Sequence, residues 1–312
     1  MSALRNAAQE YLSIRRAVGF KLARTEGLLL SFVDFADAQA ATHVTSELAL
    51  RWATLPATAS PAWWNSRLCV VRCFARHLSA LDPSTQVPPV DLLPRVPGRT
   101  RRATPYLYSD AEIAALMAAA ASRRFPLTAA TCRTIIGLLA VTGMRIGEVL
   151  RLEEADVDWE RGVLIVRQSK FDRSREVPLH PSTLVALRAY ADVRDEHFPH
   201  PQHSNSFFVS WSGGRLSYSA FRGHFNDLVR RAGLKPTSPR CRPRLHDFRH
   251  RFACLTLEDW YRTGVEVQPR LPLLSTYLGH VDPNSTYWYV SARPELLASA
   301  TDRLTRFLGD LP

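Results

Sequence analysis

Residues 163–179, VLIVRQSKFDRSREVPL, decide the fold class of this chain, because they interrupt a sequence that is otherwise patterned for helices. Residues 163–166 and 175–179 are short apolar runs typical of strands, and the polar segment between them predicts a turn. We therefore expect a β-hairpin with Lys170 near its tip. The chain as a whole predicts a mainly α fold with a small β-hairpin or sheet.

Helical patterns surround this hairpin on both sides. Before it, Ser109 and Glu112 have the spacing of a capping box that opens a helix. A buried helix over about 132–141 then ends at Gly143, and another begins at 146–152. After the hairpin, helical patterns cover 181–195, 218–232, 245–258, 272–278 and about 295–308. We expect these segments to form a mixed α/β domain over residues 107–312 that ends in a C-terminal helix.

The first 82 residues predict a small, all-helical domain. Short helices are expected at 46–52 and 61–81, after two earlier ones. Residues 83–106 are rich in proline and arginine, which favours a linker that is either a solvated loop or a basic strap across a DNA backbone. Apolar residues at helical spacing mark the helices: Ala7, Tyr11, Ile14 and Val18; Leu28, Phe32 and Phe35; Trp64, Leu68, Val71, Phe74 and Leu78.

The composition narrows the choice of partner and compartment. The 312 residues carry a formal net charge of +11, which favours a polyanionic partner, nucleic acid first and an acidic membrane surface second. No stretch approaches the ~18 uncharged apolar residues that span a bilayer, and the N-terminus lacks the apolar core of a signal peptide. We expect a cytoplasmic protein without a membrane partner. The scattered cysteines argue against disulfides, and Cys69 and Cys73 are expected to be buried.

The segment 142–152, TGMRIGEVLRL, contains the first candidate functional residue. Arg145 lies between a helix that ends at Gly143 and the start of the next helix. Its guanidinium and the nearby backbone N–H groups suit an anion site. The alternative is a surface arginine that pairs with Glu148 one turn away. Both interpretations fit this segment taken alone.

The segment 245–253, LHDFRHRFA, places His246 and Arg249 three residues apart on a predicted helix, and therefore on one face. His250 lies one turn from His246, but Asp247 stands where a zinc protease needs a glutamate, so we expect no metal here. A histidine beside an arginine suits a phosphate better than a cation, because the guanidinium repels positive charge.

Three further residues each have a structural and a functional interpretation. His280 follows Gly279 at a helix end, where it is either a C-cap or a site residue. Tyr289 is either a core aromatic or a nucleophile; Tyr287 lies roughly 200° away on a helix, so at most one of the two faces a given site. Lys170 is either a solvated charge or an acid, since lysine releases a proton where arginine cannot.

Taken together, these residues resemble the tyrosine recombinase (phage integrase) family. The family pattern is an Arg in a TGxRxxE segment, a hairpin Lys, an HxxR helix, an LGH, and a Tyr nine residues after that His. The helical first domain is also similar in type to the family's core-binding domain, and the tail after His280 looks like a branch carried by transposons and other mobile elements. This sequence supplies, in order, Arg145 with Glu148, Lys170, His246 with Arg249, His280 after Leu278-Gly279, and Tyr289.

The resemblance implies a site-specific recombinase that needs no metal or cofactor and that cuts and rejoins double-stranded DNA through a 3′-phosphotyrosyl intermediate. It also implies a tetramer on two DNA sites, with or without partner recombinases, in which the amphipathic stretch 294–308 docks on its own domain or on a neighbouring protomer. Two alternatives share the scaffold: a type IB topoisomerase-like enzyme and a non-catalytic DNA-binding accessory factor. The implied site residues are Arg145, Lys170, His246, Arg249, His280 and Tyr289.

Overall fold

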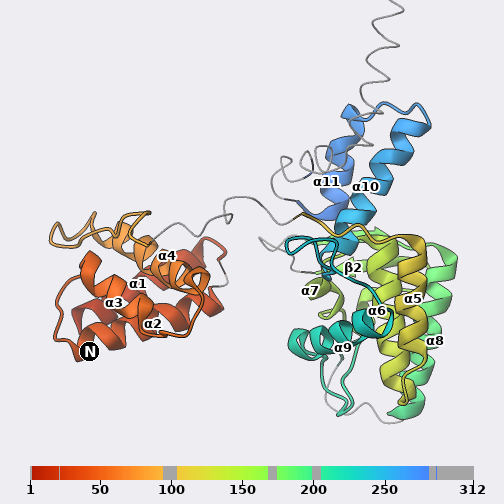
Figure 1. Cartoon of the computed structure of the whole chain (residues 1–312), viewed down its shortest axis with the longest axis horizontal. Coiled ribbons are helices and arrows are strands. Elements are labelled where there is room, and N and C mark those ends of the chain that lie inside the picture. Colours follow the sequence, from red (N-terminus) through yellow and green to blue (C-terminus); the bar gives the residue numbers. More distant parts are fainter. Residues whose placement is uncertain are drawn as a thin grey trace, which may run out of the picture. The chain divides into compact units, whose positions relative to one another are not determined.

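The computed structural model describes residues 2–20, 22–93, 104–167, 174–198, 205–280 and 286. The chain divides into two compact units, residues 1–102 and 103–312, and each has a hydrophobic core of its own. Helices dominate, with one small antiparallel sheet (Figure 1). The predicted fold class is therefore confirmed.

The first unit packs α1 (Ala3–Ala17), α2 (Ala23–Ala38), α3 (Ser46–Thr54) and α4 (Pro61–Leu78) around one core. The hydroxyls of Ser2, Thr45 and Ser60 cap α1, α3 and α4, each accepting a hydrogen bond from the backbone N–H three residues later. Phe32 and Trp52 are buried between the helices and meet edge to face, with ring centroids 5.4 Å apart.

One expectation about burial in this unit is wrong, and one of the apolar stripes marked in the sequence is turned partly outward. Ile14 and Val18 are 46% and 62% exposed, because Val18 follows the last residue of α1 and Ile14 lies beside the inward stripe. Cys69 and Cys73 are exposed on α4, since that helix turns a neighbouring stripe inward. The stripe of α1 that does pack inward consists of Leu4, Ala8, Tyr11 and Leu12.

The segment that follows α4 packs on the first unit. Leu93 is 8% exposed and belongs to the core of that unit. Arg72 of α4 donates hydrogen bonds from Nε and Nη2 to the carbonyl oxygens of Pro88 and Pro89, each at 2.7 Å. The first part of the proline-rich stretch is thus held on the helical unit, and the proposed basic strap stays a prediction because its arginines, Arg95, Arg99, Arg101 and Arg102, lie outside the described residues.

The second unit begins with a layer of helices. Ser109 and Glu112 form the predicted capping box at the start of α5 (Asp110–Ala121). This helix and α8 (Pro181–His197) both pack on α6 (Pro126–Thr142), and α9 (Tyr218–Arg231) packs against α5 and α6 (Figure 1). Gly143 ends α6 in the left-handed conformation, as the sequence predicts.

The sheet of the second unit follows a single helical turn, α7 (Ile146–Val149), and a 3₁₀ turn, Glu154–Asp156. Its strands are β1 (Val157–Asp158), β2 (Val163–Val166) and β3 (Arg175–Pro178), in the antiparallel order β1-β2-β3. The two predicted hairpin strands are confirmed. The structure adds β1, which was not predicted, and α7 is shorter than the expected helix. Lys170 lies outside the described residues.

The last described helices are α10 (Asp247–Arg262) and α11 (Leu271–Leu278), joined through a 3₁₀ turn at Gln268–Arg270. They lie side by side and bury a small apolar core of their own (Figure 1). The sequence predicts that His246 is part of this helix. In the structure α10 begins at Asp247, so His246 is its N-cap residue instead. The predicted helix at 295–308 lies outside the described residues.

Gly143 should not tolerate a side chain. Its φ of +60° lies in the left-handed region, and a Cβ atom would lie 2.7 Å from Cδ1 of Phe252. We expect Gly143→Ala to lower the free energy of unfolding by about 1–3 kcal/mol, measured by urea denaturation. The control is Gly223→Ala, at an open position within α9, which should raise stability by up to ~1 kcal/mol. Equal effects of the two substitutions would contradict this account of Gly143.

Candidate active site

A buried carboxylate lies at the centre of the candidate site. Glu148 of α7 is 4% exposed. Its Oε1 accepts from Nη1 of Arg145 at 2.8 Å, and its Oε2 accepts from the backbone N–H of the same residue at 3.0 Å. Nη2 and Nη1 of Arg175 donate to Oε2 and Oε1 at 2.7 and 3.2 Å. Burial alone would raise the pKa of Glu148, but the hydrogen bonds and charges of the two arginines lower it to about 2.

Arg145 is directed into the site by the backbone on both sides of it. The left-handed turn at Gly143 ends α6, and the extended Arg145 is the N-cap residue of α7. Its Nη2 donates to the carbonyl oxygen of Gly279 at 3.0 Å. The sequence left Arg145 as either part of an anion site or the partner of Glu148. The two interpretations are compatible, because the ion pair with Glu148 holds the guanidinium at the end of α11.

Arg249 approaches the same place from α10. The residue is 1% exposed. Its Nη1 donates to the carbonyl oxygen of Gly143 at 3.1 Å, and its Nη2 donates to that of Leu278. These bonds connect the end of α6 to the end of α11.

The carbonyl end of α11 thus receives three arginines. Nε of Arg175 donates to the carbonyl oxygen of Tyr277 at 2.8 Å, next to the bonds that Arg249 and Arg145 make to Leu278 and Gly279. The last carbonyl groups of a helix lack partners within the helix and carry partial negative charge. This end of α11 therefore helps to hold three like charges close together.

The Leu-Gly-His motif has a structural explanation at this point. Gly279 has a φ of +66°, and its N–H donates to the carbonyl oxygen of Thr276, while the N–H of His280 donates to that of Ser275, both at 2.9 Å. This is a Schellman motif. His280 is therefore a backbone cap of α11 and, at the same time, the residue that the cap presents to the arginines.

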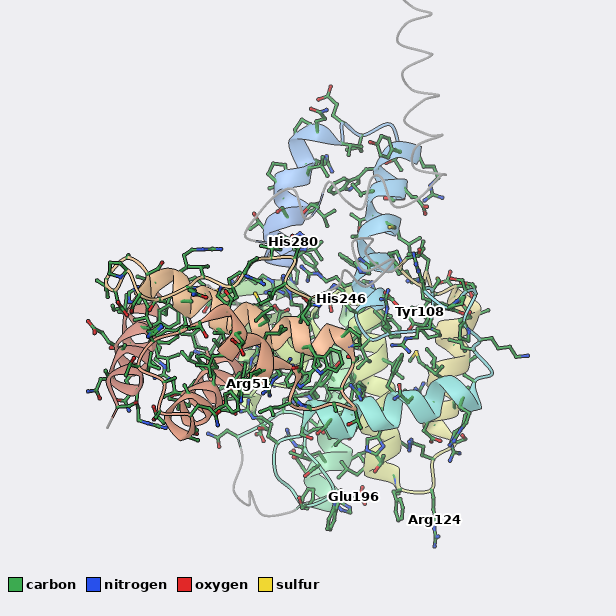
Figure 2. The ribbon with its side chains drawn as sticks, turned by 60° about the vertical axis from the view of Figure 1, so that its left-hand side comes forward. Arg51, Tyr108, Arg124, Glu196, His246 and His280 are labelled. Carbon is green, nitrogen blue, oxygen red and sulfur yellow. The ribbon has the colours of Figure 1, made fainter. Side chains whose placement is uncertain are left out.

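Two histidines lie beside these arginines. Figure 2 labels His246 at the start of α10 and His280 just after α11. His246 is exposed at the surface, but the partial withdrawal of its ring from water, followed by the charges of Arg249 and Arg145, lowers its pKa to about 4. Burial and the same two charges also lower the pKa of His280 to about 4. Both rings are therefore neutral at pH 7, and His280 Nδ1 lies 2.7 Å from Oγ1 of Thr286.

The structure brings four of the six predicted site residues to one place: Arg145, His246, Arg249 and His280. Lys170 and Tyr289 lie outside the described residues, so their positions stay predictions.

Among the residues that the structure describes, no three His, Cys, Asp or Glu side chains are grouped as a metal site requires. No helix in this part of the chain is long and apolar enough to cross a membrane.

Arg175 is a member of the site that the sequence did not reveal. It is the first residue of β3, and its side chain is only 11% exposed. Within its own strand nothing distinguishes it from a surface arginine of the hairpin. Its partners Glu148 and Tyr277 lie 27 and 102 residues away along the chain, so the contacts exist only in the folded protein.

Comparison with known proteins gives consistent matches. Residues 107–295 match the model of the phage integrase family. The chain is 44% identical over 311 residues to the putative integrase/recombinase y4rB of Sinorhizobium fredii, covering 98% of each chain. A solved Tn1549 transposon integrase in complex with transposon right end DNA matches with a TM-score of 0.63 at 17% identity, over 98% of this chain and 99% of that one. A lambda integrase tetramer bound to a Holliday junction matches with a TM-score of 0.58 at 19% identity, over 92% and 76%.

Replacing the central carboxylate should destabilise the second unit. Glu148→Gln leaves the half-buried Arg145 and the nearly buried Arg175 without their anion, and we expect a loss of about 3 kcal/mol at neutral pH. The folded-state pKa of about 2 lies below the ordinary 4.5, so the ionised carboxylate stabilises the fold above pH 4.5, and this contribution is lost as the pH falls towards 2. The difference between wild type and variant, measured by urea denaturation, should shrink over that range.

The matched control for this measurement is Glu176→Gln. Glu176 also pairs with an arginine, Arg161, but its side chain is 50% exposed. Exposed pairs contribute little, so we expect a change within about 0.5 kcal/mol. If Glu148→Gln changes stability no more than Glu176→Gln does, the carboxylate is not the anchor described above.

Proposed function

The chain belongs to the phage integrase family of tyrosine recombinases, and we propose that it is a site-specific recombinase that breaks and rejoins DNA through a covalent bond to Tyr289. The observation that carries this proposal is the meeting of Arg145 and Arg249 at the end of α11, next to His246 and His280. These groups come from distant parts of the chain and match the chemistry of one phosphodiester.

Two arginines address the main obstacle to cleavage. A phosphodiester is a poor electrophile because its anionic oxygens repel a nucleophile, and further charge develops in the transition state. In our proposal Arg145 and Arg249 bind the nonbridging oxygens, and His246 and His280 donate further hydrogen bonds. Glu148 does not react and keeps Arg145 oriented.

Tyr289 then attacks phosphorus in line with the 5′-oxygen. The P–O bond to that oxygen breaks, which leaves a 3′-phosphotyrosyl enzyme and a free 5′-hydroxyl, with Lys170 donating the proton to the leaving oxygen. Since His246 is neutral at pH 7, it is able to accept the tyrosine proton. The phosphotyrosine linkage conserves the energy of the phosphodiester, so a 5′-hydroxyl of another strand completes rejoining without ATP.

The proposed substrate is double-stranded DNA. A net charge of +11 suits a polyanion, and the Tn1549 and lambda integrases of similar fold were both solved on DNA. The lambda integrase forms a tetramer on a Holliday junction, which supports a tetramer of this chain on two DNA sites. The likeness in fold to a transposon integrase supports a role in a mobile element.

A covalent protein–DNA adduct tests the assignment of the nucleophile. On a nicked suicide site the wild-type protein should form an adduct that survives SDS, and Tyr289→Phe should abolish it, because the hydroxyl that attacks phosphorus is gone. DNA binding by the variant, followed by gel shift, should stay intact. Tyr287→Phe is the neighbouring control and should retain the adduct. Loss of the adduct in Tyr287→Phe alone would move the nucleophile to that residue. No adduct with wild type would favour an accessory DNA-binding factor.

A chemical rescue tests Lys170 as the general acid. Lys170→Ala should slow cleavage by about 10²–10⁴-fold, the usual contribution of a positioned proton donor. A substrate with sulfur at the 5′-bridging position has a better leaving group that needs no proton. The variant should therefore cleave this substrate at nearly the wild-type rate, in single-turnover experiments. If sulfur restores nothing, Lys170 acts elsewhere.

Relaxation of plasmids that lack a specific site would favour the topoisomerase alternative.

A further inference from the structure

Arg175 has no part in the chemistry just described, yet it contacts the site from an element that carries none of the other arginines. Its guanidinium forms two hydrogen bonds to the carboxylate of Glu148, at 2.7 and 3.2 Å. Its Nε donates to the carbonyl oxygen of Tyr277 at 2.8 Å. One side chain of β3 therefore connects α7 with the carbonyl end of α11.

These contacts close a ring through the site. Arg145 also binds Glu148, and it donates to the carbonyl oxygen of Gly279, two residues beyond the carbonyl bound by Arg175. Two arginines thus hold the same helix end from two sides, with one carboxylate between them. A change in the position of either arginine shifts the carboxylate and so affects the other arginine.

The backbone before His280 is shaped to admit this side chain. A Cβ atom on Gly279 would lie 2.9 Å from Nη1 and 3.2 Å from Cζ of Arg175. The guanidinium therefore passes against the backbone of Gly279, directly before His280. The glycine serves the left-handed turn and also leaves room for Arg175.

We propose that Arg175 is a positioning residue of the strand-transfer site, which fixes Glu148, and through it Arg145, relative to the end of α11 that carries His280. The inference rests on the proposed function, and Arg175 itself makes no contact with the substrate. Only a planar, forked cation binds both carboxylate oxygens and a carbonyl oxygen in fixed directions, so lysine is an incomplete substitute.

The electrostatics of the site supply a readout that a purely structural role would not change. The hydrogen bonds and charge of Arg175 are the foremost of the influences that lower the pKa of Glu148 against burial. Without Arg175 this pKa rises, so protonation of Glu148 releases Arg145 at a higher pH than in wild type. A variant that lacks Arg175 should therefore lose activity at a higher pH than the wild type does.

The test is single-turnover adduct formation by Arg175→Gln and Arg175→Lys at saturating DNA. We expect Arg175→Gln to be slower by about 10–100-fold, the range seen when a residue that orients a metal ligand is lost, with unchanged DNA affinity and with the loss of activity on acidification shifted to higher pH. Arg175→Lys should recover part of the rate. The matched control is Arg161→Gln, which removes an exposed bidentate pair with Glu176, the next residue of β3, and it should cleave at the wild-type rate.

A double-mutant cycle with Glu148→Gln separates the coupling between Arg175 and Glu148 from any loss of rate that each substitution causes on its own, for example through lower stability. If Arg175 acts through Glu148, the double variant is no slower than Glu148→Gln alone; additive losses overturn the proposal. A wild-type rate and pH profile for folded Arg175→Gln, or an equal loss in Arg161→Gln, also overturn it.

Failure of the proposed function is distinguishable, because the wild-type protein then forms no adduct. In that case an NMR titration of His280 decides, since the charge of Arg175 is among those that lower the pKa of this ring. Arg175→Gln should raise the pKa of His280, and an unchanged value overturns the proposal.

Discussion

The ionised carboxylate of Glu148, buried between two guanidinium groups, is the constraint on which the site of the second unit depends. A carboxylate is removed from water only where cations and hydrogen-bond donors replace its hydration. The arginines in turn need a nearby anion, because Arg145, Arg175 and Arg249 all bind the carbonyl end of one short helix, α11. At an effective dielectric constant of about 20, two like charges 4 Å apart repel by roughly 4 kcal/mol. The carboxylate of Glu148 offsets this repulsion between Arg145 and Arg175, which both bind it.

The end of α11 completes this arrangement through its backbone. The left-handed Gly279 closes the helix and turns the carbonyl groups of Tyr277, Leu278 and Gly279 towards the arginines. The left-handed backbone and the close approach of Arg175 thus both favour glycine at position 279. Agreement between local and tertiary demands of this kind is what allows a sequence to specify one structure.

Features set by neighbouring residues could be predicted from the sequence. The capping box of Ser109 and Glu112, the helix end at Gly143 and the two hairpin strands all depend on a few consecutive side chains. The two-residue strand β1 was missed because it exists only through its pairing with β2. The inward face of α1 was misjudged at Ile14, since an apolar residue at helical spacing fits more than one stripe.

The site was predictable only as a set. Taken singly, Arg145 fits a surface ion pair and His280 a helix cap. The structure shows that Arg145 does pair with Glu148, although that carboxylate is buried, and that His280 does cap α11. Their common purpose became visible in the sequence through the family pattern of spacings. Arg175 belongs to no such pattern, and its hydrogen bonds to Glu148 of α7 and to the carbonyl end of α11 join segments that are distant along the chain.

The same electrostatics explain how one site can suit the protein both with and without DNA. In the free protein, burial and the charges of the arginines keep His246 and His280 neutral, which limits the positive charge that the fold must accommodate. In the proposed function, a phosphodiester placed among these groups adds a negative charge that offsets Arg145 and Arg249, and the pKa of each histidine then rises. In the proposed reaction, the higher pKa makes His246 a better acceptor for the proton of Tyr289.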